Sequence, residues 1–288
     1  MERTMTYEQL LAEAEPMLAT KAEGTRKFYM RVLRYFDDFP CRASIVEKTN
    51  EWLEAGISAR TVNNNHNAIR WAMKKFPRQF DPYDTQEAFN YMRDIKASKP
   101  KMSVATKEQA EKVIASTDER TALAVALMFY HGLRISDVVA LKLSNFSESE
   151  KGTVLDFVDE KTKQPHTYIL IDRVVPLMRR YMNGQRRDIM AAWSPDKEQA
   201  SEYLFVSRNG HLTQRSLQRI VVDTCKELGF PGLHPHSFRH GCATAYAKAG
   251  ASAAVIQYAL GHKSIASSQR YIHLNEDDLA SVSKGVFG

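Results

Sequence analysis

The residues His236-Ser237-Phe238-Arg239-His240 open the helical C-terminal part of the chain, and the fold follows most directly from them. Apolar residues recur there at helical spacing and predict helices over 237–249, 252–260 and 264–272. His236 and Arg239 lie three residues apart and so share one helix face. Gly261 ends the second helix, which frees His262 from helical packing. The stretch therefore favours a helical domain in which imidazole and guanidinium groups come together.

The middle of the chain predicts more helices and one small sheet. A strongly apolar helix over 120–131 is expected to be buried and to end at Gly132. Thr106 and Gln109 form a capping-box pattern ahead of an earlier helix. Two strand-like runs flank a lysine-rich turn and predict a hairpin. The further predicted elements are this hairpin over 153–171, a strand over 203–206, and helices over 173–190 and 214–228. The fold class is mainly α with a small antiparallel β-sheet.

The first hundred residues predict a separate helical domain. Thr25 is a candidate N-cap ahead of an apolar stripe at helical spacing. A second stripe runs from Val62 to Phe76. The polar, basic segment broken by Pro100 is typical of a linker. The predicted boundaries are a helical domain over 1–98, a linker over 99–105, and a second domain with a C-terminal tail over 106–288.

The face opposite the second stripe is polar and basic. Arg and Asn are residue types that reach the phosphates and base edges of DNA. The candidate DNA-binding residues on this face are Arg60, Asn63, Asn64, Asn67, Arg70 and Lys74. The alternative is a face that is only solvated, as on most amphipathic helices.

The composition is that of a globular protein with a mild basic excess. Of 288 residues, 43% are hydrophobic and 26% charged, which excludes a collagen-like or largely disordered chain. The net charge of +6 favours an anionic partner. The longest apolar run, residues 122–130, is too short to cross a membrane, and we find no secretion signal. Cys41, Cys225 and Cys242 are scattered, which fits a reducing cytoplasm.

Motifs for nucleotide or metal chemistry are absent from the sequence. There is no GxxxxGK[ST] phosphate loop, no GxGxxG and no HExxH. His236 and His240 lie four residues apart, near His234, and share a helix face as two zinc ligands can. Arg239 stands between them, and a cation beside a dication is unfavourable. We therefore predict neither a metal nor a cofactor.

The donor-rich runs of the second domain suit the cleavage of a phosphodiester. Two guanidiniums can clamp the charge that its transition state spreads over the non-bridging oxygens. An imidazole can hold a proton, a lysine can protonate the leaving oxygen, and a tyrosine hydroxyl can attack phosphorus. Such an enzyme needs no metal and no nucleotide. The runs are Gly132-Leu133-Arg134-Ile135-Ser136-Asp137, Glu160-Lys161-Thr162-Lys163, His236-Ser237-Phe238-Arg239-His240, Leu260-Gly261-His262 and Arg270-Tyr271-Ile272-His273.

In this order and spacing the sequence resembles the tyrosine recombinase (phage integrase) family, of the simple two-domain type. The run at Arg134 is similar to the family's first arginine box, and the run at His236 to its second. The runs at His262 and Tyr271, nine residues apart, are similar to the third. Ser58-Ala59-Arg60-Thr61-Val62-Asn63 is similar to the segment that opens a DNA-facing helix in the family's N-terminal core-binding domain. The resemblance implies that helical domain followed by a mostly helical, mixed α/β catalytic domain.

The resemblance implies roles for the groups that meet the scissile phosphate. Arg134 and Arg239 would stabilise its charge, and Asp137, three residues beyond Arg134, would support that side chain through an ion pair. Lys161 would be the general acid for the leaving 5′-hydroxyl. Lys163, in the same turn, is its rival for that role.

The remaining implied roles concern the nucleophile. Tyr271 would attack phosphorus and form a 3′-phosphotyrosyl link. His236 would assist proton transfer around the nucleophile, and His262 would contact and position the phosphate. His240 and His273 would support these side chains from behind or serve only the fold.

Two positions depart from the family's pattern. Asp137 stands where the family more often has Glu, which shortens the reach to Arg134. Gly241 stands where Thr is common, which is expected to loosen the start of its helix.

The implied function is site-specific DNA recombination, for integration, excision or resolution of DNA elements in the cytoplasm. The chain would be a monomer in solution and a homotetramer on two DNA duplexes that carry a specific recombination site, with or without an accessory DNA-bending protein. From the length we expect no additional arm-binding domain. A C-terminal apolar tail would dock on a neighbouring protomer or on its own domain, through Leu279, Val282, Val286 and Phe287.

Two alternatives remain open. A type IB topoisomerase or hairpin telomere resolvase uses a similar constellation and differs in its product. A catalytically silent DNA-binding regulator would use the same fold with no turnover, and in it Tyr271→Phe would change nothing.

Overall fold

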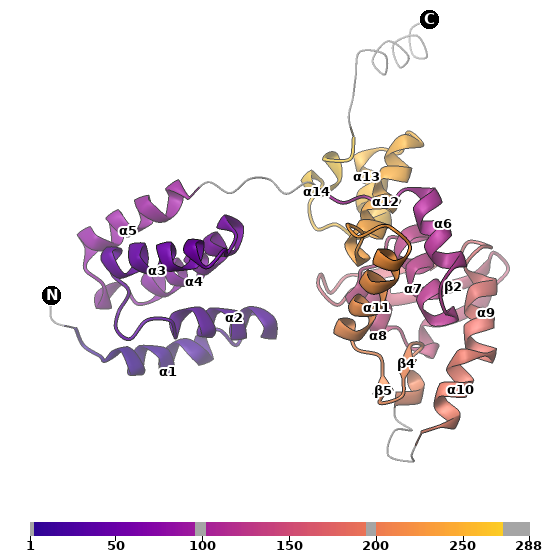
Figure 1. The fold of residues 1–288 in the computed structure, drawn as a ribbon, viewed down its shortest axis with the longest axis horizontal. Helices are drawn as coiled ribbons and strands as arrows, with labels where there is room; N and C mark the ends of the chain where they lie inside the picture. The colour runs from indigo at the N-terminus through magenta and orange to yellow at the C-terminus, as the bar shows by residue number, and fades with distance from the viewer. Residues whose placement is uncertain (1–2, 96–101, 194–199, 273–288) are drawn as a thin grey trace, which may run out of the picture. The chain divides into compact units, whose positions relative to one another are not determined.

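The computed structural model describes residues 3–95, 102–193 and 200–272, and the chain divides into two compact units, Met1–Lys101 and Met102–Gly288 (Figure 1). Each unit has its own apolar core. The described residues are mainly helical, with two small antiparallel sheets in the second unit. The predicted fold class is confirmed.

The first unit is built from helices around one core. Its helices are α1 (Tyr7–Met17), α2 (Glu23–Leu33), α3 (Arg42–Glu54), α4 (Ala59–Lys75), the short 3-10 helix η1 (Pro77–Gln79) and α5 (Pro82–Asp94). The predicted N-cap at Thr25 is wrong, because α2 begins two residues earlier with Ala22 as its N-cap. The Thr25 N–H already donates to the Ala22 carbonyl at 2.9 Å, inside the first turn.

The second unit is organised around α7, whose residues from Thr121 to Phe129 are all buried. α7 packs against α6, α8, α9, α10, α11 and α12. The helices of this unit are α6 (Lys107–Ala115), α7 (Glu119–Tyr130), α8 (Ile135–Ala140), the 3-10 helix η2 (Leu143–Asn145), α9 (Val175–Asn183), α10 (Gln185–Ala191), α11 (Gln214–Glu227), α12 (Pro235–Lys248), α13 (Ala253–Leu260) and α14 (Ala266–Gln269). The predicted buried helix and the capping box at Thr106 and Gln109 are confirmed.

The main sheet has three antiparallel strands in the order β1-β2-β3, where the sequence predicts only a hairpin. The strands are β1 (Phe146–Ser149), β2 (Gly152–Val158) and β3 (Pro165–Ile169). β2 and β3 confirm the hairpin, with Leu155 opposite Tyr168. β1 is an edge strand of mostly exposed, polar residues, so it lacks the apolar alternation that marks a strand in sequence.

Three further elements differ from the prediction. The helix predicted over 173–190 breaks at Gly184, because the Glu119 carboxylate approaches that glycine and accepts from the Gln185 N–H at 2.8 Å. The strand predicted over 203–206 is a single bridge from Tyr203 to Lys142, followed by the two-stranded sheet of β4 (Val206–Ser207) and β5 (Gly210–His211). The helix predicted over 264–272 contracts to α14, and Tyr271 stands in the turn beyond it.

The predicted linker is shorter on its C-terminal side. Residues 99–101 lie outside the described part of the chain, as do His273 and the predicted tail. The Ala105 N–H donates to the Ser237 carbonyl at 3.0 Å, and Ser103 Oγ donates to the Gly232 carbonyl at 2.7 Å. Ala105 is buried in the second core, so residues 103–105 belong to the second unit.

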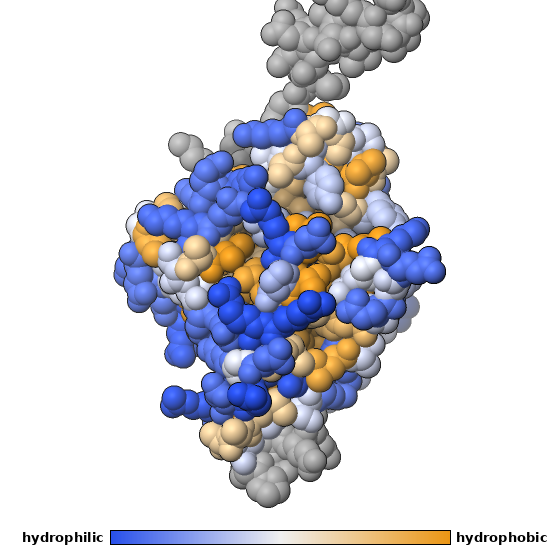
Figure 2. Space-filling model, turned by 90° about the vertical axis from the view of Figure 1, so that its right-hand side faces the viewer, coloured by the Kyte–Doolittle hydropathy of each residue, from blue (hydrophilic) through white to orange (hydrophobic). Residues whose placement is uncertain are grey.

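No helix among the described residues is long and apolar enough to span a membrane. Hydrophilic side chains cover most of the face of the molecule seen in Figure 2, around an apolar stretch near its middle.

Helix α12 runs unbroken through Gly241, whose lack of a side chain serves packing instead of loosening the helix. A Cβ at this position would collide with the Ala105 carbonyl oxygen and lie 2.8 Å from the Phe129 ring. We expect Gly241→Ala to lower the free energy of unfolding by about 1–3 kcal/mol, the usual cost of overpacking. Urea unfolding measures it, with Gly232→Ala, which meets only Ser103 Oγ at 3.9 Å, as the control. Equal midpoints for the two variants would contradict the prediction.

Candidate active site

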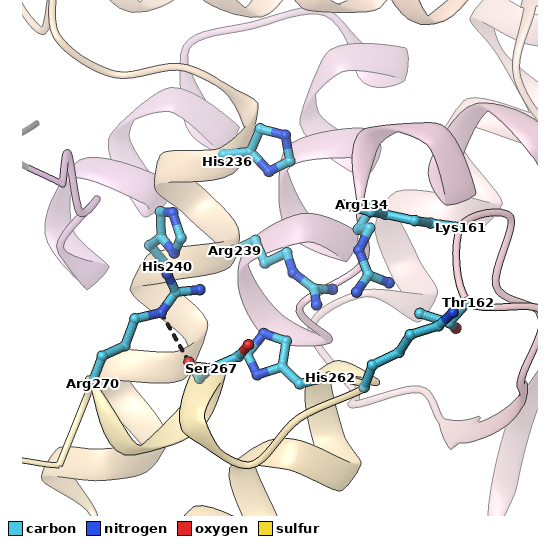
Figure 3. Close-up of a pocket in the computed structure, with 10 residues that line it drawn as sticks. Arg134, Lys161, Thr162, His236, Arg239, His240, His262, Ser267 and Arg270 are labelled. Carbon is cyan, nitrogen blue, oxygen red and sulfur yellow. Dashed lines mark hydrogen bonds between the residues drawn. The ribbon is translucent and has the colours of Figure 1, made fainter. Parts of the chain in front are cut away.

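A cavity of about 310 Å³ in the second unit gathers five of the six predicted catalytic side chains (Figure 3). They come from the start of α8, from the β2–β3 turn, from α12 and from the segment after α13. The residues that line the cavity are Arg134, Lys161, Thr162, His236, Arg239, His240, His262, Lys263, Ser267 and Arg270. The sixth predicted residue, Tyr271, is buried directly against this set.

Arg134 enters the cavity because the chain reverses after α7. Gly132 takes the left-handed conformation at φ 66°, and Arg134 becomes the N-cap of α8. Its guanidinium is hydrogen-bonded to the Asp159 carboxylate and donates to the Gly261 carbonyl at 3.2 Å. The predicted ion pair with Asp137 is present at the longer distance of 3.8 Å. Asp159, which the sequence analysis missed, is therefore the closer partner of this arginine.

Arg239 is held from behind by two backbone carbonyls. Its guanidinium donates to the Gly132 oxygen and, at 2.5 Å, to the Leu260 oxygen. Burial first, and then the nearby Arg134 cation, lower the pKa of Arg239 to about 10, so it stays charged at neutral pH. In Figure 3 the two guanidiniums lie side by side, with His236 above and His262 below them. Two such forks can bind the non-bridging oxygens of one phosphodiester.

The β2–β3 turn separates the two candidate lysines. Lys161 lines the cavity. Lys163 has a positive φ of 57°, is not among the lining residues, and pairs with Glu160 at 3.2 Å on the exposed side of the turn. The geometry favours Lys161 as the side chain that can reach a bound phosphodiester.

The imidazoles on the cavity are neutral at pH 7. Burial first, and then Arg239 and Arg134, lower the pKa of His262 to about 4. Its Nδ1 is hydrogen-bonded to Ser268 Oγ at 2.8 Å, which fixes the ring. Burial also lowers the pKa of His236, with neighbouring positive groups adding to the effect. A neutral ring can donate one hydrogen bond and accept another beside the two arginines without adding charge.

Tyr271 is held by two imidazoles. Its ring stacks on His262 with centroids 6.4 Å apart, and its hydroxyl is hydrogen-bonded to His240 Nδ1 at 2.5 Å. Burial raises the pKa of Tyr271 above its ordinary value, while the positive charges of Arg270 and Arg239 oppose that rise. His240, predicted to play a supporting part, is thus the imidazole in contact with the hydroxyl. His236 lines the cavity and has no such contact in the described part of the chain.

Three charged residues of the site were missed by the sequence analysis. Asp159 ends the strand run just before the lysine turn, a position that signals a turn but not a partner 25 residues away. Lys263 follows His262 of the third box, and Arg270, which belongs to that box, was given no role; both line the cavity. The Arg270 Nε–H donates to the Ser267 carbonyl at 2.8 Å, drawn as a dashed line in Figure 3. Their adjacency to His262 and Tyr271 was the available signal.

The predicted DNA-binding face lies on α4 of the first unit, and its members differ in exposure. The exposed side chains are those of Arg60, Asn64, Asn67 and Lys74. Asn63 is half-buried and donates to the Ile95 carbonyl at 3.0 Å, so it is engaged within the unit. Arg70 is also half-buried, and burial followed by repulsion from Arg93 lowers its pKa. Asn64 and Asn67 share a groove with Thr25, Phe28 and Tyr29 of α2.

The described residues contain no group of three or more His, Cys, Asp or Glu side chains placed to hold a metal ion. His236 lies with ring centroids 6.3 Å from His234 and 6.5 Å from His240.

Residues 103–278 match the phage integrase family, and the chain belongs to that family. Tyrosine recombinase XerC of Oceanobacillus iheyensis is 25% identical over 281 residues, covering 88% of this chain and 87% of that protein. Tyrosine recombinase XerC of Bifidobacterium longum (strain DJO10A) is 28% identical over 175 residues. Its alignment covers 58% of this chain and 46% of that protein, so the chain spans about half the length of such relatives.

Solved structures show the same fold. The Tn1549 transposon integrase, in complex with circular intermediate DNA, superposes with a TM-score of 0.72 at 20% identity, over 98% of this chain and 100% of that chain. A lambda integrase dimer bound to a COC′ core site gives 0.69 at 20% identity, over 93% and 96%. At this identity the likeness establishes the fold.

Proposed function

We propose that this chain is a site-specific DNA recombinase that cleaves and rejoins DNA through a 3′-phosphotyrosyl intermediate. One observation carries the proposal: two arginines, a lysine and neutral imidazoles line one cavity, with a tyrosine hydroxyl held against it. These are the groups that phosphodiester transfer requires. Relatives named tyrosine recombinases and an integrase solved on DNA support the assignment.

The cleavage step assigns each group a role. The Tyr271 oxygen attacks phosphorus, the Tyr271 O–P bond forms and the bond from phosphorus to the 5′ oxygen breaks. Arg134 and Arg239 bind the non-bridging oxygens, while Lys161 gives its proton to the leaving 5′ oxygen. His240 takes the hydroxyl proton. Rejoining reverses these transfers, with a 5′-hydroxyl of the partner duplex as the attacking group.

The other imidazoles position the reacting groups. His262 stacks on the Tyr271 ring and faces both arginines, so it suits contact with the phosphate. His236 lies on the cavity next to His240 and suits proton exchange with it or with the phosphate. Asp137 keeps its part as a support of Arg134.

The proposed partner is double-stranded DNA that carries a specific recombination site. We assign the exposed face of α4, with its groove against α2, as the DNA contact of the first unit. A lambda integrase tetramer has been solved on a Holliday junction, and we propose the same assembly here, from monomers in solution, with or without an accessory DNA-bending protein. Because its substrate is DNA, we place the enzyme in the cytoplasm, on the nucleoid or on phage DNA in an infected cell.

A covalent trap tests this function. Nicked duplex fragments of the source genome let the short strand beside the cleavage point escape, so a protein–DNA adduct accumulates and can be sequenced. Intact substrates built from the trapped site then distinguish the products. Recombinants would support the proposal, whereas relaxed circles or sealed hairpins alone would favour a type IB topoisomerase or telomere resolvase. Footprinted binding without any adduct would favour a catalytically silent regulator.

His240 gives a direct test of the proton acceptor. We expect His240→Ala to slow single-turnover cleavage by about 10²-fold or more, because a positioned base contributes at least that much. Burial first, and then Arg270, lower the pKa of His240 to about 4, so the ring accepts protons throughout pH 6–8. The wild-type cleavage rate should therefore not fall through His240 protonation between pH 8 and pH 6. The loss sets in only as the pH approaches 4.

His234→Ala is the matched control, since His234 is an exposed imidazole in the same region that does not line the cavity. It should cleave at the wild-type rate. If His240→Ala also cleaves at that rate, the proton acceptor is another group.

A further inference from the structure

The carboxylate of Asp159 links two parts of the site that would otherwise be independent. One oxygen, Oδ2, is hydrogen-bonded to the Arg134 guanidinium. The other, Oδ1, accepts from the Lys161 N–H at 2.8 Å and from the Thr162 N–H at 2.6 Å. Asp159 is 2% exposed, so water does not compete for these bonds.

The main chain of Asp159 also closes the turn that carries Lys161. The Asp159 N–H donates to the Gln164 carbonyl at 2.9 Å, and the Lys163 N–H donates back to the Asp159 carbonyl at 2.8 Å. Asp137 fastens the same turn to α8, since its Oδ1 accepts from the Glu160 N–H at 3.1 Å. The turn is therefore held in place by carboxylates that also contact Arg134.

Lys161 depends on this turn for its position. Its side chain is exposed, and its Nζ has no hydrogen-bond or ion-pair partner within the described residues. A side chain without partners of its own is aimed by its backbone alone. The two N–H bonds to Asp159 Oδ1, together with the bonds that close the turn, therefore fix the direction in which Lys161 leaves it.

We propose that Asp159 is a positioning residue that sets the phosphate-binding Arg134 and the proton-donating Lys161 in register through its two oxygens. The inference rests on the proposed function of both side chains. Asp159 exchanges no proton itself: Lys161 protonates the leaving 5′ oxygen as its bond to phosphorus breaks. Asp159 ensures that the donor stands beside the phosphate that Arg134 binds.

A substrate with sulfur in place of the leaving 5′ oxygen separates proton donation by Lys161 from phosphate binding by Arg134. A thiol has a pKa near 8.5, so a thiolate leaves without protonation and no longer needs Lys161. Lys161→Ala should therefore lose about 10²–10⁴-fold on the oxygen substrate, the usual worth of general acid catalysis, and regain most of it on the sulfur substrate. Arg134→Ala should stay slow on both substrates.

Two substitutions of Asp159 then test the coupling, on DNA built from the site found by the covalent trap. Asp159→Ala removes both oxygens, so we expect it to slow cleavage of the oxygen substrate at least about 10²-fold and to be partly rescued by sulfur. Asp159→Asn keeps one oxygen for the Lys161 and Thr162 N–H groups and loses the charge that faces Arg134. This variant should cleave both substrates slowly, and the ratio of its cleavage rates on the sulfur and oxygen substrates should equal the wild-type ratio.

The controls keep the outcomes distinct. Asp156→Ala changes an exposed carboxylate on β2, the strand that leads into the turn, where it is hydrogen-bonded to Thr167, and it should match the wild-type rates. If Asp159→Ala slows cleavage of the oxygen and sulfur substrates by the same factor, the coupling is overturned. A site that is misfolded, or that has lost only Arg134, would be slowed equally whichever group leaves. If Asp159→Ala does not fold, a sulfur rescue of Asp159→Asn overturns it in turn. Absence of any wild-type adduct would instead refute the proposed function.

Discussion

Tyr271→Phe is expected to abolish the covalent protein–DNA adduct while leaving DNA affinity unchanged. The substitution removes one oxygen atom, and that oxygen is the proposed nucleophile. The ring remains, with its stacking on His262 and its burial in the small core beneath α13. The lining of the described cavity otherwise offers cations, imidazoles and the alcohol hydroxyls of Thr162 and Ser267, and we expect none of them to take over the attack. Cleavage of nicked duplexes, followed by denaturing gels, measures the adduct.

The same variant measures what the hydroxyl contributes to the fold. Loss of its hydrogen bond to His240 should lower the free energy of unfolding by about 1 kcal/mol, the net worth of one such bond. Gel-shift titration should return the wild-type dissociation constant. An adduct that persists in Tyr271→Phe would assign the nucleophile to another side chain, and weakened binding would mean that the hydroxyl contacts DNA before cleavage.

Arg239→Lys is expected to slow cleavage by about 10²–10³-fold, the cost of removing one preorganised donor from a charged transition state. Lysine keeps the charge but not the planar fork, so it cannot hold two carbonyls and still face the phosphate. Burial of Arg239, at 6% exposure, leaves no room for water to replace the missing donor. Single-turnover kinetics on the trapped site measure the loss. A methylphosphonate at the scissile position, which removes one negative charge, should narrow the gap to the wild-type rate.

Arg186→Lys is a matched control for this prediction. Arg186 is likewise 6% exposed, and it donates to the carbonyls of Leu204, Ser201 and Tyr203 far from the lining of the cavity. Both substitutions should lower stability, because each leaves buried carbonyls short of a donor. Only Arg239→Lys should lose cleavage once folding is matched. Equal loss in both variants would mean that Arg239 serves the fold alone.

Local sequence patterns predict the helices and helix ends whose formation depends on interactions between residues close together in the sequence. Gly132 and Gly261 both take the left-handed conformation that ends or follows a helix, as their positions indicate. The helix over 214–228 and the buried helix before Gly132 also agree with the structure. Spacing along α12 places His236 and Arg239 on the cavity. The family's boxes supply most of the remaining lining, but not Lys263 or Ser267, nor the partners that hold the lining side chains from behind.

What sequence cannot supply here are contacts between distant segments. Gly184 breaks a continuous helical pattern only because Glu119, on another helix, approaches it. The sequence around Asp159 does not indicate that its carboxylate contacts Arg134. The contact of the Tyr271 hydroxyl with His240, which the sequence analysis did not predict, depends on how the turn after α14 returns Tyr271 to α12. Each of these contacts can be identified only once the packed fold is known.

The carbonyls of Gly132, Leu260 and Gly261 are all bound by the two cavity arginines, so the side chains with the proposed catalytic role also join the ends of α7 and α13. Evolution can therefore not discard them freely. We expect a related protein that still binds its DNA site but no longer transfers strands to lose Lys161 first. Its side chain makes no hydrogen bond or ion pair within the described residues, so its loss would not destabilise the fold. Catalytically inactive relatives should therefore retain both arginines, and a substitution at the position of Lys161 should be the first sign that activity has been lost.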